Sequence, residues 1–182
     1  LNRALQEAVN PPAPDKQEKS FGTVLFREGD RVMQVKNNYD ILWQKENGEE
    51  GMGVYNGDIG FIETIDRPSK TMQVRFDDRL AEYLFEMAPE VDFDGHRAAY
   101  PPDMMTQLEL AYAVTVHKAQ GSEYRAVILS AVEAAPMLLT RGILYTAMTR
   151  AKELLILVGD DQVVARMAAN DRQQRRYSGL RA

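Results

Sequence analysis

Residues 113–124, AVTVHKAQGSEY, place hydroxyl, imidazole, ammonium, amide and carboxylate groups within one short stretch. The pattern predicts an apolar strand followed by a short helix from Thr115 to Gln120, which ends at Gly121. Free backbone N–H groups at the start of a helix attract phosphate. The stretch is therefore a candidate phosphate-binding segment.

The side chains of this stretch fit the same chemistry. Thr115 and His117 supply hydrogen-bond donors, and Lys118 supplies positive charge. Gly121 permits a bend in the backbone, and beyond it Glu123 can accept hydrogen bonds from hydroxyl groups. Each residue taken alone is better explained by an ordinary strand–helix junction with a capped helix and a solvated Lys–Glu pair. The twelve residues together favour phosphate binding.

A second stretch, residues 144–152 with the sequence LYTAMTRAK, offers a different chemistry. Arg150 stands at the end of a predicted helix and shortly before an apolar strand. A guanidinium held there can project from a motor domain and stabilise charge on a phosphoryl group during its transfer. The alternative is that Arg150 and Lys152 only complement the negative end of the helix dipole.

Alternating strands and helices must position both stretches. Thr140 can cap a helix that runs to Thr149 and has its apolar residues on one side. The run LLILV is typical of a parallel strand buried on both faces. The predicted elements form an α/β sandwich, with strands at 108–114, 125–130 and 154–158 and a last helix after Gly159.

The first half of the chain has a different pattern. Residues 1–9 have helical spacing, and the proline-rich run that follows stops the helix. Short strands are predicted at 31–35, at 54–62 around an Asn-Gly hairpin turn, and at 70–76. The many turns between residues 48 and 107 predict a small all-β insert.

The composition excludes several kinds of site. The 182 residues contain no cysteine and two histidines, so disulfides and Cys- or His-based metal clusters are excluded, and we predict no metal site. No apolar run is long enough to span a membrane and no signal peptide opens the chain, which favours a cytoplasmic protein. The first residue is Leu1 rather than methionine, which suggests a piece of a longer protein.

The net charge of −5 is unevenly distributed. Residues 46–109 hold 15 acidic and 5 basic residues, a net of −10, whereas residues 141–182 hold 4 acidic and 8 basic residues, a net of +4. Phosphate binding depends on the local field more than on the total charge. The basic end of the chain can therefore face an anion while the acidic middle faces away.

The stretches AYAVTVHKAQGSEY and LYTAMTRAK resemble motifs V and VI of superfamily 1 DNA helicases, and the wording is closest to the RecD-like branch, including the RecD/TraA type. LNRALQEAVNPPAP, GDRVMQVKNNYD and VYNGDIG resemble the same branch. The resemblance is to the C-terminal part, the UvrD-like helicase C-terminal domain. It implies a RecA-like parallel sheet sandwich, motor domain 2A, at 1–47 and 108–182, interrupted at 48–107 by an SH3-like β-barrel, 2B.

The resemblance also implies which residues face the nucleotide. Arg150 matches the motif VI arginine that contacts the γ-phosphate, and we predict that it is catalytic. Glu123 matches the motif V glutamate near the ribose. Gln120 and Gly121 belong to the same nucleotide-facing turn.

For DNA, the resemblance assigns phosphate contacts to three residues of the first stretch: Thr115, His117 and Lys118. Asn37 and Asn38 are further candidates, although asparagines in a turn have a local reason to be there. Trp43 is either a platform for a base or a packed surface side chain.

The implied function is ATP-driven translocation on single-stranded DNA, 5′→3′, with duplex unwinding. ATP and Mg²⁺ would be held mainly by an N-terminal motor domain. No GxxxxGK[ST] motif occurs in the sequence, so the chain alone should not hydrolyse ATP. The alternatives are a non-catalytic DNA- or protein-binding module that keeps the fold and the helicase half of a conjugative relaxase. Repair, recombination and plasmid transfer all stay open as pathways.

Overall fold

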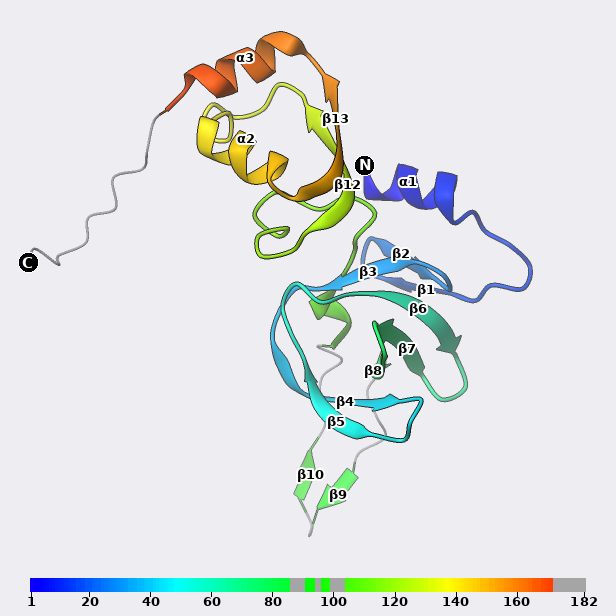
Figure 1. Cartoon of the computed structure of the whole chain (residues 1–182). Helices are drawn as coiled ribbons and strands as arrows, with labels where there is room; N and C mark the ends of the chain where they lie inside the picture. Colours follow the sequence, from blue (N-terminus) through cyan, green and yellow to red (C-terminus); the bar gives the residue numbers. More distant parts are fainter. Residues whose placement is uncertain (86–90, 94–95, 99–103, 172–182) are drawn as a thin grey trace, which may run out of the picture. The chain divides into compact units, whose positions relative to one another are not determined.

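The computed structural model describes residues 1–85, 91–93, 96–98 and 104–171, and the chain divides into two compact units (Figure 1). Unit 1 is Leu1–Ala113 and unit 2 is Val114–Ala182. Within the described ranges, no helix is long and apolar enough to cross a membrane.

Unit 1 begins with a helix, as predicted, and continues with short strands. Its elements in chain order are α1 (Asn2–Val9), β1 (Glu18–Phe21), β2 (Val24–Arg27), β3 (Arg31–Gln34), β4 (Asn38–Lys45), β5 (Glu50–Val54), β6 (Ile59–Asp66), β7 (Thr71–Phe76), β8 (Arg79–Leu84), β9 (Val91–Phe93), β10 (His96–Ala98), a 3₁₀ turn (Met104–Gln107) and β11 (Leu108–Leu110).

Seven of these strands form one antiparallel sheet in the order β11-β3-β6-β7-β8-β4-β5, which curls around the interior of unit 1 (Figure 1). β7 illustrates how the sheet fills this interior. Met72, Val74 and Phe76 are buried, while the residues between them are half-exposed. Alternation of this kind puts every second side chain on the core face. The buried side chains of the sheet then form a single apolar cluster.

A buried carboxylate fastens α1 to the sheet. Asp30 is fully buried, and its Oδ2 accepts hydrogen bonds from the Gln6 side chain at 2.6 Å and from the Arg27 backbone N–H at 2.7 Å. Its Oδ1 accepts from the Asn10 side chain at 2.8 Å and from the Tyr112 hydroxyl at 2.9 Å. Four donors compensate the loss of water around the carboxylate, so helix, turn and residue 112 are joined at one point.

The compact units divide at 113/114, whereas the predicted domain boundaries lie at 47/48 and 107/108. β3 and β4, which precede residue 48, pair with β6, β5 and β8, and β11, which follows residue 107, pairs with β3. The compact β unit therefore runs from residue 1 to residue 113. Local patterns show where strands lie, but pairing between distant strands decides which of them share a core.

The predicted hairpin at 54–62 is corrected. β5 and β6 flank the Asn-Gly turn, yet they are not neighbours in the sheet. β5 pairs with β4, and β6 pairs with β3 and β7. The turn is held instead by the Gly57 N–H, which donates to the Gln34 carbonyl at 2.8 Å.

Unit 2 is a small α/β layer. Its elements are β12 (Tyr124–Ala131), α2 (Arg141–Met148), β13 (Ala151–Gly159) and α3 (Asp161–Ala169). β12 and β13 pair in parallel, and α2 and α3 pack through Leu144, Val163 and Met167. The predicted cap is confirmed, since the Thr140 side chain accepts from the Ile143 N–H.

The predicted burial of the apolar strand on both faces is wrong for the described part of the chain. In β13, Leu154, Ile156 and Val158 are 51%, 42% and 53% exposed, and Ile128 of β12 is 71% exposed. A parallel strand is buried on both faces only when helices cover both sides of its sheet. Among the described residues, α2 and α3 give unit 2 only one buried apolar cluster, with Leu129 packed against it.

Candidate functional site

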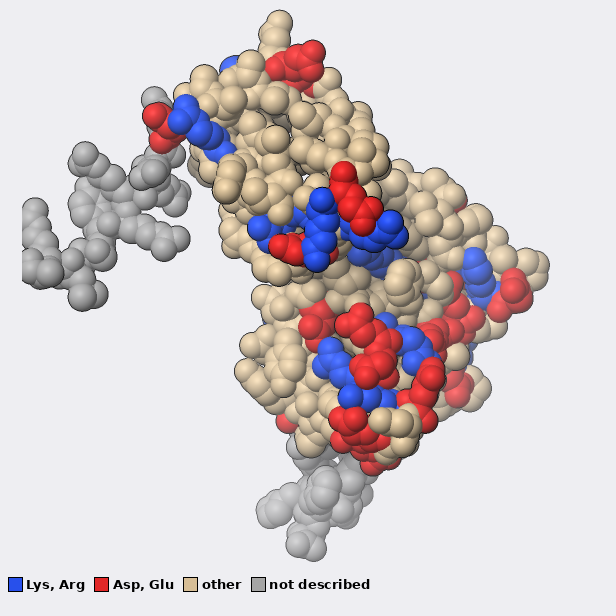
Figure 2. Space-filling view, in the orientation of Figure 1, with Lys and Arg blue, Asp and Glu red and all other residues tan. Residues whose placement is uncertain are grey.

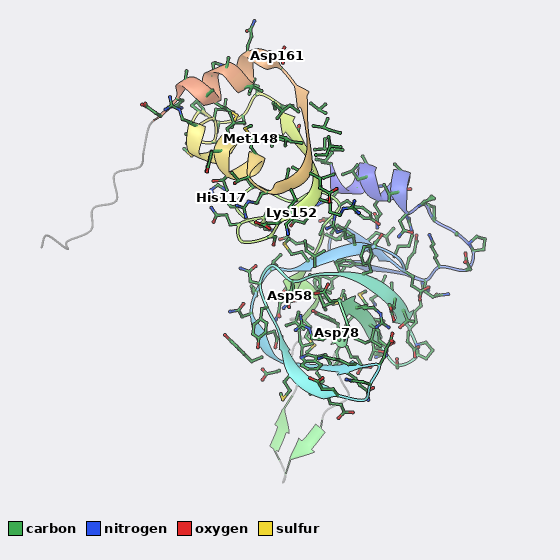
Figure 3. All side chains as sticks on the ribbon, in the orientation of Figure 1. Asp58, Asp78, His117, Met148, Lys152 and Asp161 are labelled. Atoms are coloured by element: carbon green, nitrogen blue, oxygen red, sulfur yellow. The ribbon has the colours of Figure 1, made fainter. Side chains whose placement is uncertain are left out.

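The two chemically distinctive stretches of the sequence meet at the end of unit 2 where the parallel strands begin. Tyr124, the first residue of β12, is in register with Ala151, the first residue of β13. The Tyr124 N–H donates to the Arg150 carbonyl at 2.8 Å. Figure 3 shows His117 and Lys152 at this end and Asp161 at the opposite end, where β13 has finished.

Residues 116–121 form consecutive turns, in place of the predicted helix from Thr115 to Gln120. The Ala119 N–H donates to the Thr115 carbonyl at 3.0 Å, across four residues as in an α-helix. The next bond, from the Gln120 N–H to the His117 carbonyl, spans only three residues. Gly121, with φ of 85°, then turns the chain toward β12. A single turn lacks the aligned peptide dipoles of a helix, so the segment offers local N–H groups and side chains rather than a helix dipole.

Thr115 and His117 are both exposed at this turn, and Lys118 is half-buried. The Thr115 hydroxyl oxygen accepts weakly from the Lys118 N–H at 3.3 Å, which is a local capping contact. Exposed hydroxyl and imidazole groups beside a half-buried lysine are suited to a phosphate backbone. Their contact with DNA stays a prediction.

Arg150 is half-buried and uses all three guanidinium nitrogens. Its Nε donates to the Thr146 carbonyl at 3.1 Å, and one terminal nitrogen donates to the Thr149 hydroxyl at 3.3 Å. The other terminal nitrogen donates to the Ser122 carbonyl at 3.0 Å. The first two bonds are those of a side chain at a helix end, as expected if Arg150 only complements the helix dipole. The third links Arg150 to the turn that carries Gly121 and Glu123.

Glu123 is exposed and pairs with the Lys152 ammonium, while the charge of Arg150 acts on it more weakly. The Lys152 ammonium is 2.9 Å from Glu123 Oε2. The hydrogen bond and charge of Lys152, with a smaller effect from Arg150, lower the pKa of the Glu123 carboxyl. An ionised, accessible carboxylate is a ready acceptor for hydroxyl groups. Gln120 is also exposed in this turn.

The structure thus brings Arg150, Glu123, Gly121 and Gln120 together, whereas Asn37 and Asn38 lie in unit 1. Asn37 Oδ1 accepts from the Asn56 N–H at 2.9 Å and so fixes a turn. The Asn38 amide donates to Gln107 Oε1 at 2.9 Å. Both side chains have structural partners, and their contact with DNA stays a prediction.

Trp43 is packed against its own sheet. A Cβ at position 51 would come within 2.3 Å of the indole ring, which explains the glycine there. The ring also packs against the main core cluster. Its Nε1 is buried and has no hydrogen-bond partner among the residues that the structure describes. Packing of this kind favours the interpretation of Trp43 as a packed surface side chain over that of a platform for a base.

Sequence reasoning missed the pairing of Lys152 with Glu123. It gave Lys152 only a contribution to the helix dipole. The charges at positions 123, 125, 152 and 153 were visible, but their pairing depends on the register of two strands nearly thirty residues apart. Figure 2 shows basic and acidic side chains next to one another on the visible face.

The sequence predicts a basic last part of the chain, but basic and acidic residues are equal in number in the part that the structure describes. Residues 141–171 contain four basic and four acidic residues. The other four basic residues, Arg172, Arg175, Arg176 and Arg181, lie outside the described residues.

The fold and this arrangement define a class of protein, an SH3-like β unit joined to an α/β unit of the RecA-like type. Residues 1–76 match the ATP-dependent RecD-like DNA helicase SH3 domain, and residues 110–158 match the UvrD-like helicase C-terminal domain.

The chain is also similar to named helicases in sequence and in fold. The chain is 32% identical over 149 residues to the ATP-dependent RecD2 DNA helicase of Deinococcus radiodurans, across 82% of the chain and 17% of that protein. It is 31% identical over 131 residues to the RecBCD enzyme subunit RecD of Mycolicibacterium smegmatis, across 72% of the chain and 20% of that protein. The Bacteroides Pif1 helicase, in complex with ADP-AlF3 and ssDNA, has a similar fold, with a TM-score of 0.53 at 19% identity, across 91% of the chain and 39% of that chain.

The two matched domains make the chain RecD-like, with a RecD-like helicase SH3 domain followed by a UvrD-like helicase C-terminal domain. It spans no more than a fifth of the length of either of these two relatives.

Proposed function

We propose that this chain is the C-terminal part of an ATP-dependent DNA helicase and that unit 2 supplies one half of its nucleotide site. The observation that supports this best is the hydrogen bond from the Arg150 guanidinium to the Ser122 carbonyl. It joins the two motif-like stretches on one surface, with the exposed Glu123 carboxylate beside them.

The residues present fit one side of a bound ATP. Arg150 would reach the γ-phosphate, where a planar cation stabilises the charge that develops during phosphoryl transfer. Glu123 would accept hydrogen bonds from the ribose, and Gln120 and Gly121 would shape the turn between these groups. Three of the five N–H donors of the guanidinium are used by Thr146, Thr149 and Ser122, so the other two would serve the phosphate.

The rest of the nucleotide site belongs, in this proposal, to an N-terminal motor domain of the same protein. A phosphate loop of the type GxxxxGK[ST] is absent from this sequence, and that loop usually supplies the lysine and the hydroxyl that bind phosphate and Mg²⁺. ATP and Mg²⁺ are therefore held mainly there.

The DNA-facing part of the proposal consists of the exposed Thr115 and His117 and the neighbouring Lys118, which precede Gln120, Gly121 and Glu123 on the same loop. They would contact the phosphates of single-stranded DNA and so sense translocation, 5′→3′ in the direction of the RecD-like branch. Asn37 and Asn38 are secondary candidates. The SH3-like unit serves as the accessory 2B module of motor domain 2A, and the protein works on DNA in the cytoplasm.

The test compares the full-length protein with the 182-residue chain. Full-length protein should hydrolyse ATP, and single-stranded DNA should stimulate it, while the purified chain should show no turnover with or without DNA. Turnover by the isolated chain would contradict the half-site. Full-length protein that binds DNA but never hydrolyses ATP would identify a binding module instead.

A further inference from the structure

The parallel pairing of β12 and β13 contains one irregularity, and it lies beside the candidate site. Tyr124 pairs with Ala151, but the next pair is Ala126 with Leu154. Two residues of β13, Lys152 and Glu153, therefore stand opposite the single residue Arg125. An extra residue of this kind changes the direction of the side chains next to it, and such bulges are common beside active sites.

Two ion pairs cross between the strands at this irregularity. Glu153 forms a bidentate pair with Arg125, at 3.0 and 3.1 Å, and Lys152 pairs with Glu123 at 2.9 Å. All four side chains are more than half exposed. Both pairs are exposed and link β13 to the start of β12 or to the residue just before it, but only the second involves a residue of the candidate nucleotide site.

The Lys152 pair also belongs to a set of contacts that fixes one short segment. Residues 122–124 are held to the end of α2 and the start of β13 by three contacts in succession. Arg150 donates to the Ser122 carbonyl, Lys152 pairs with the Glu123 carboxylate, and the Tyr124 N–H donates to the Arg150 carbonyl. The two backbone contacts fix the main chain on either side of Glu123, and Lys152 fixes the carboxylate itself.

We propose that Lys152 is a positioning residue for the nucleotide site, which holds the Glu123 carboxylate where it accepts hydrogen bonds from the ribose hydroxyls of ATP. The inference rests on the proposed function, because it takes Glu123 as the ribose contact. Lys152 acts through Glu123 and touches no phosphate in this role. Without the ammonium group, the long glutamate side chain samples several rotamers. Its loss of this freedom then opposes the binding of nucleotide.

The expected effect is small and specific, since exposed ion pairs change an equilibrium by only a few-fold. In full-length protein, Lys152→Ala should raise KM for ATP about three- to fivefold and leave kcat within about twofold of the unsubstituted enzyme. It should also weaken the preference for ATP over 2′-deoxy-ATP and 3′-deoxy-ATP. Lys152→Arg keeps a cation at the same place and should restore both quantities.

Glu123→Ala and the double variant Lys152→Ala/Glu123→Ala complete a cycle. Because Lys152 acts through Glu123, the double variant should have the same KM as Glu123→Ala alone. Arg125→Ala is the matched control, since it removes the neighbouring ion pair between the same two strands. Its KM and its preference among the three nucleotides should not change.

The outcomes separate this inference from the proposed function. An unchanged KM in Lys152→Ala overturns the positioning role, and so does an effect that adds to that of Glu123→Ala. Glu123→Ala with normal KM and normal nucleotide preference overturns both the ribose contact and the inference. Absence of DNA-stimulated ATP turnover in the unsubstituted full-length protein overturns the proposed function itself.

Discussion

In unit 1 most apolar residues of the strands face a shared interior, although Leu42, Met52 and Phe61 are exposed, whereas in unit 2 many of them face outward. Ile62 in β6 is 1% exposed, and Ile128 in β12 is 71% exposed, although both are isoleucines in the middle of a strand. The difference is in what covers the sheet. Seven antiparallel strands curl around one core, but two parallel strands have helices packed against one buried cluster.

The polar residues differ in the same way. In unit 1 the carboxylate of Asp30 is consumed by internal donors, so it stabilises the fold and is closed to ligands. In unit 2 the carboxylate of Glu123 is exposed and held by a single cation. Unit 1, whose buried carboxylate is hydrogen-bonded internally, is suited to be a scaffold. Unit 2, with accessible charged groups and exposed apolar strands, is suited to contact other parts of a protein.

The largest expected effect lies in unit 2. In full-length protein, Arg150→Ala should lower ATP turnover by about 10³-fold or more, equivalent to roughly 4 kcal/mol, with much less effect on ATP binding. A charge that only complements a helix end contributes about 0.3–1 kcal/mol, seen as stability. Steady-state turnover and nucleotide affinity decide between the two roles. Retention of more than about a tenth of the turnover would exclude the catalytic role. Arg150→Lys tests whether the planar fork is needed.

The next effect tests the burial difference directly. In the 182-residue chain, Ile62→Ala should lower the free energy of unfolding of unit 1 by about 2–5 kcal/mol, because it leaves a cavity. Ile128→Ala should change that of unit 2 by less than about 0.5 kcal/mol. Trp43, the only tryptophan, reports unfolding of unit 1 by fluorescence, and hydrogen exchange of α2 and α3 reports unit 2. Equal losses would mean that Ile128 is covered in solution.

A smaller loss is expected at the carboxylate of unit 1. Asp30→Ala leaves four donors without their acceptor and should destabilise unit 1 by about 2–3 kcal/mol in urea unfolding. Asp66, which is exposed and accepts a long bond from the Ser69 N–H at 3.3 Å, provides the control. Asp66→Ala should cost less than about 1 kcal/mol. Similar costs at the two positions would contradict the central role of Asp30.

The smallest effect is a dependence of unit 1 on high pH. Burial, and then the hydrogen bond to Asp30, raise the pKa of Tyr112 to about 12. The neutral phenol is therefore favoured in the folded state, and the unfolded chain loses its proton first as the pH rises above about 10. The stabilisation is complete below that pH and is lost between about 10 and about 12. Tyr112→Phe should flatten this part of the curve of urea midpoint against pH.

The sequence determined the elements that depend on local pattern. The helix at 2–9, the strand at 71–76 and the capped helix at 141–148 all follow from spacing and capping residues, which act within a few positions of each other. It also determined the residue types near the candidate site, since the motif-like stretches are continuous in sequence.

The tertiary structure decided which of these elements share a core and which charges meet. The boundary at 113/114, the separation of β5 from β6 and the exposure of β13 all depend on partners far along the chain. The pairing of Lys152 with Glu123 depends on a one-residue shift in a parallel ladder. No local propensity specifies such a register, because a slip of one residue leaves each strand as good a strand as before and changes only what its side chains meet.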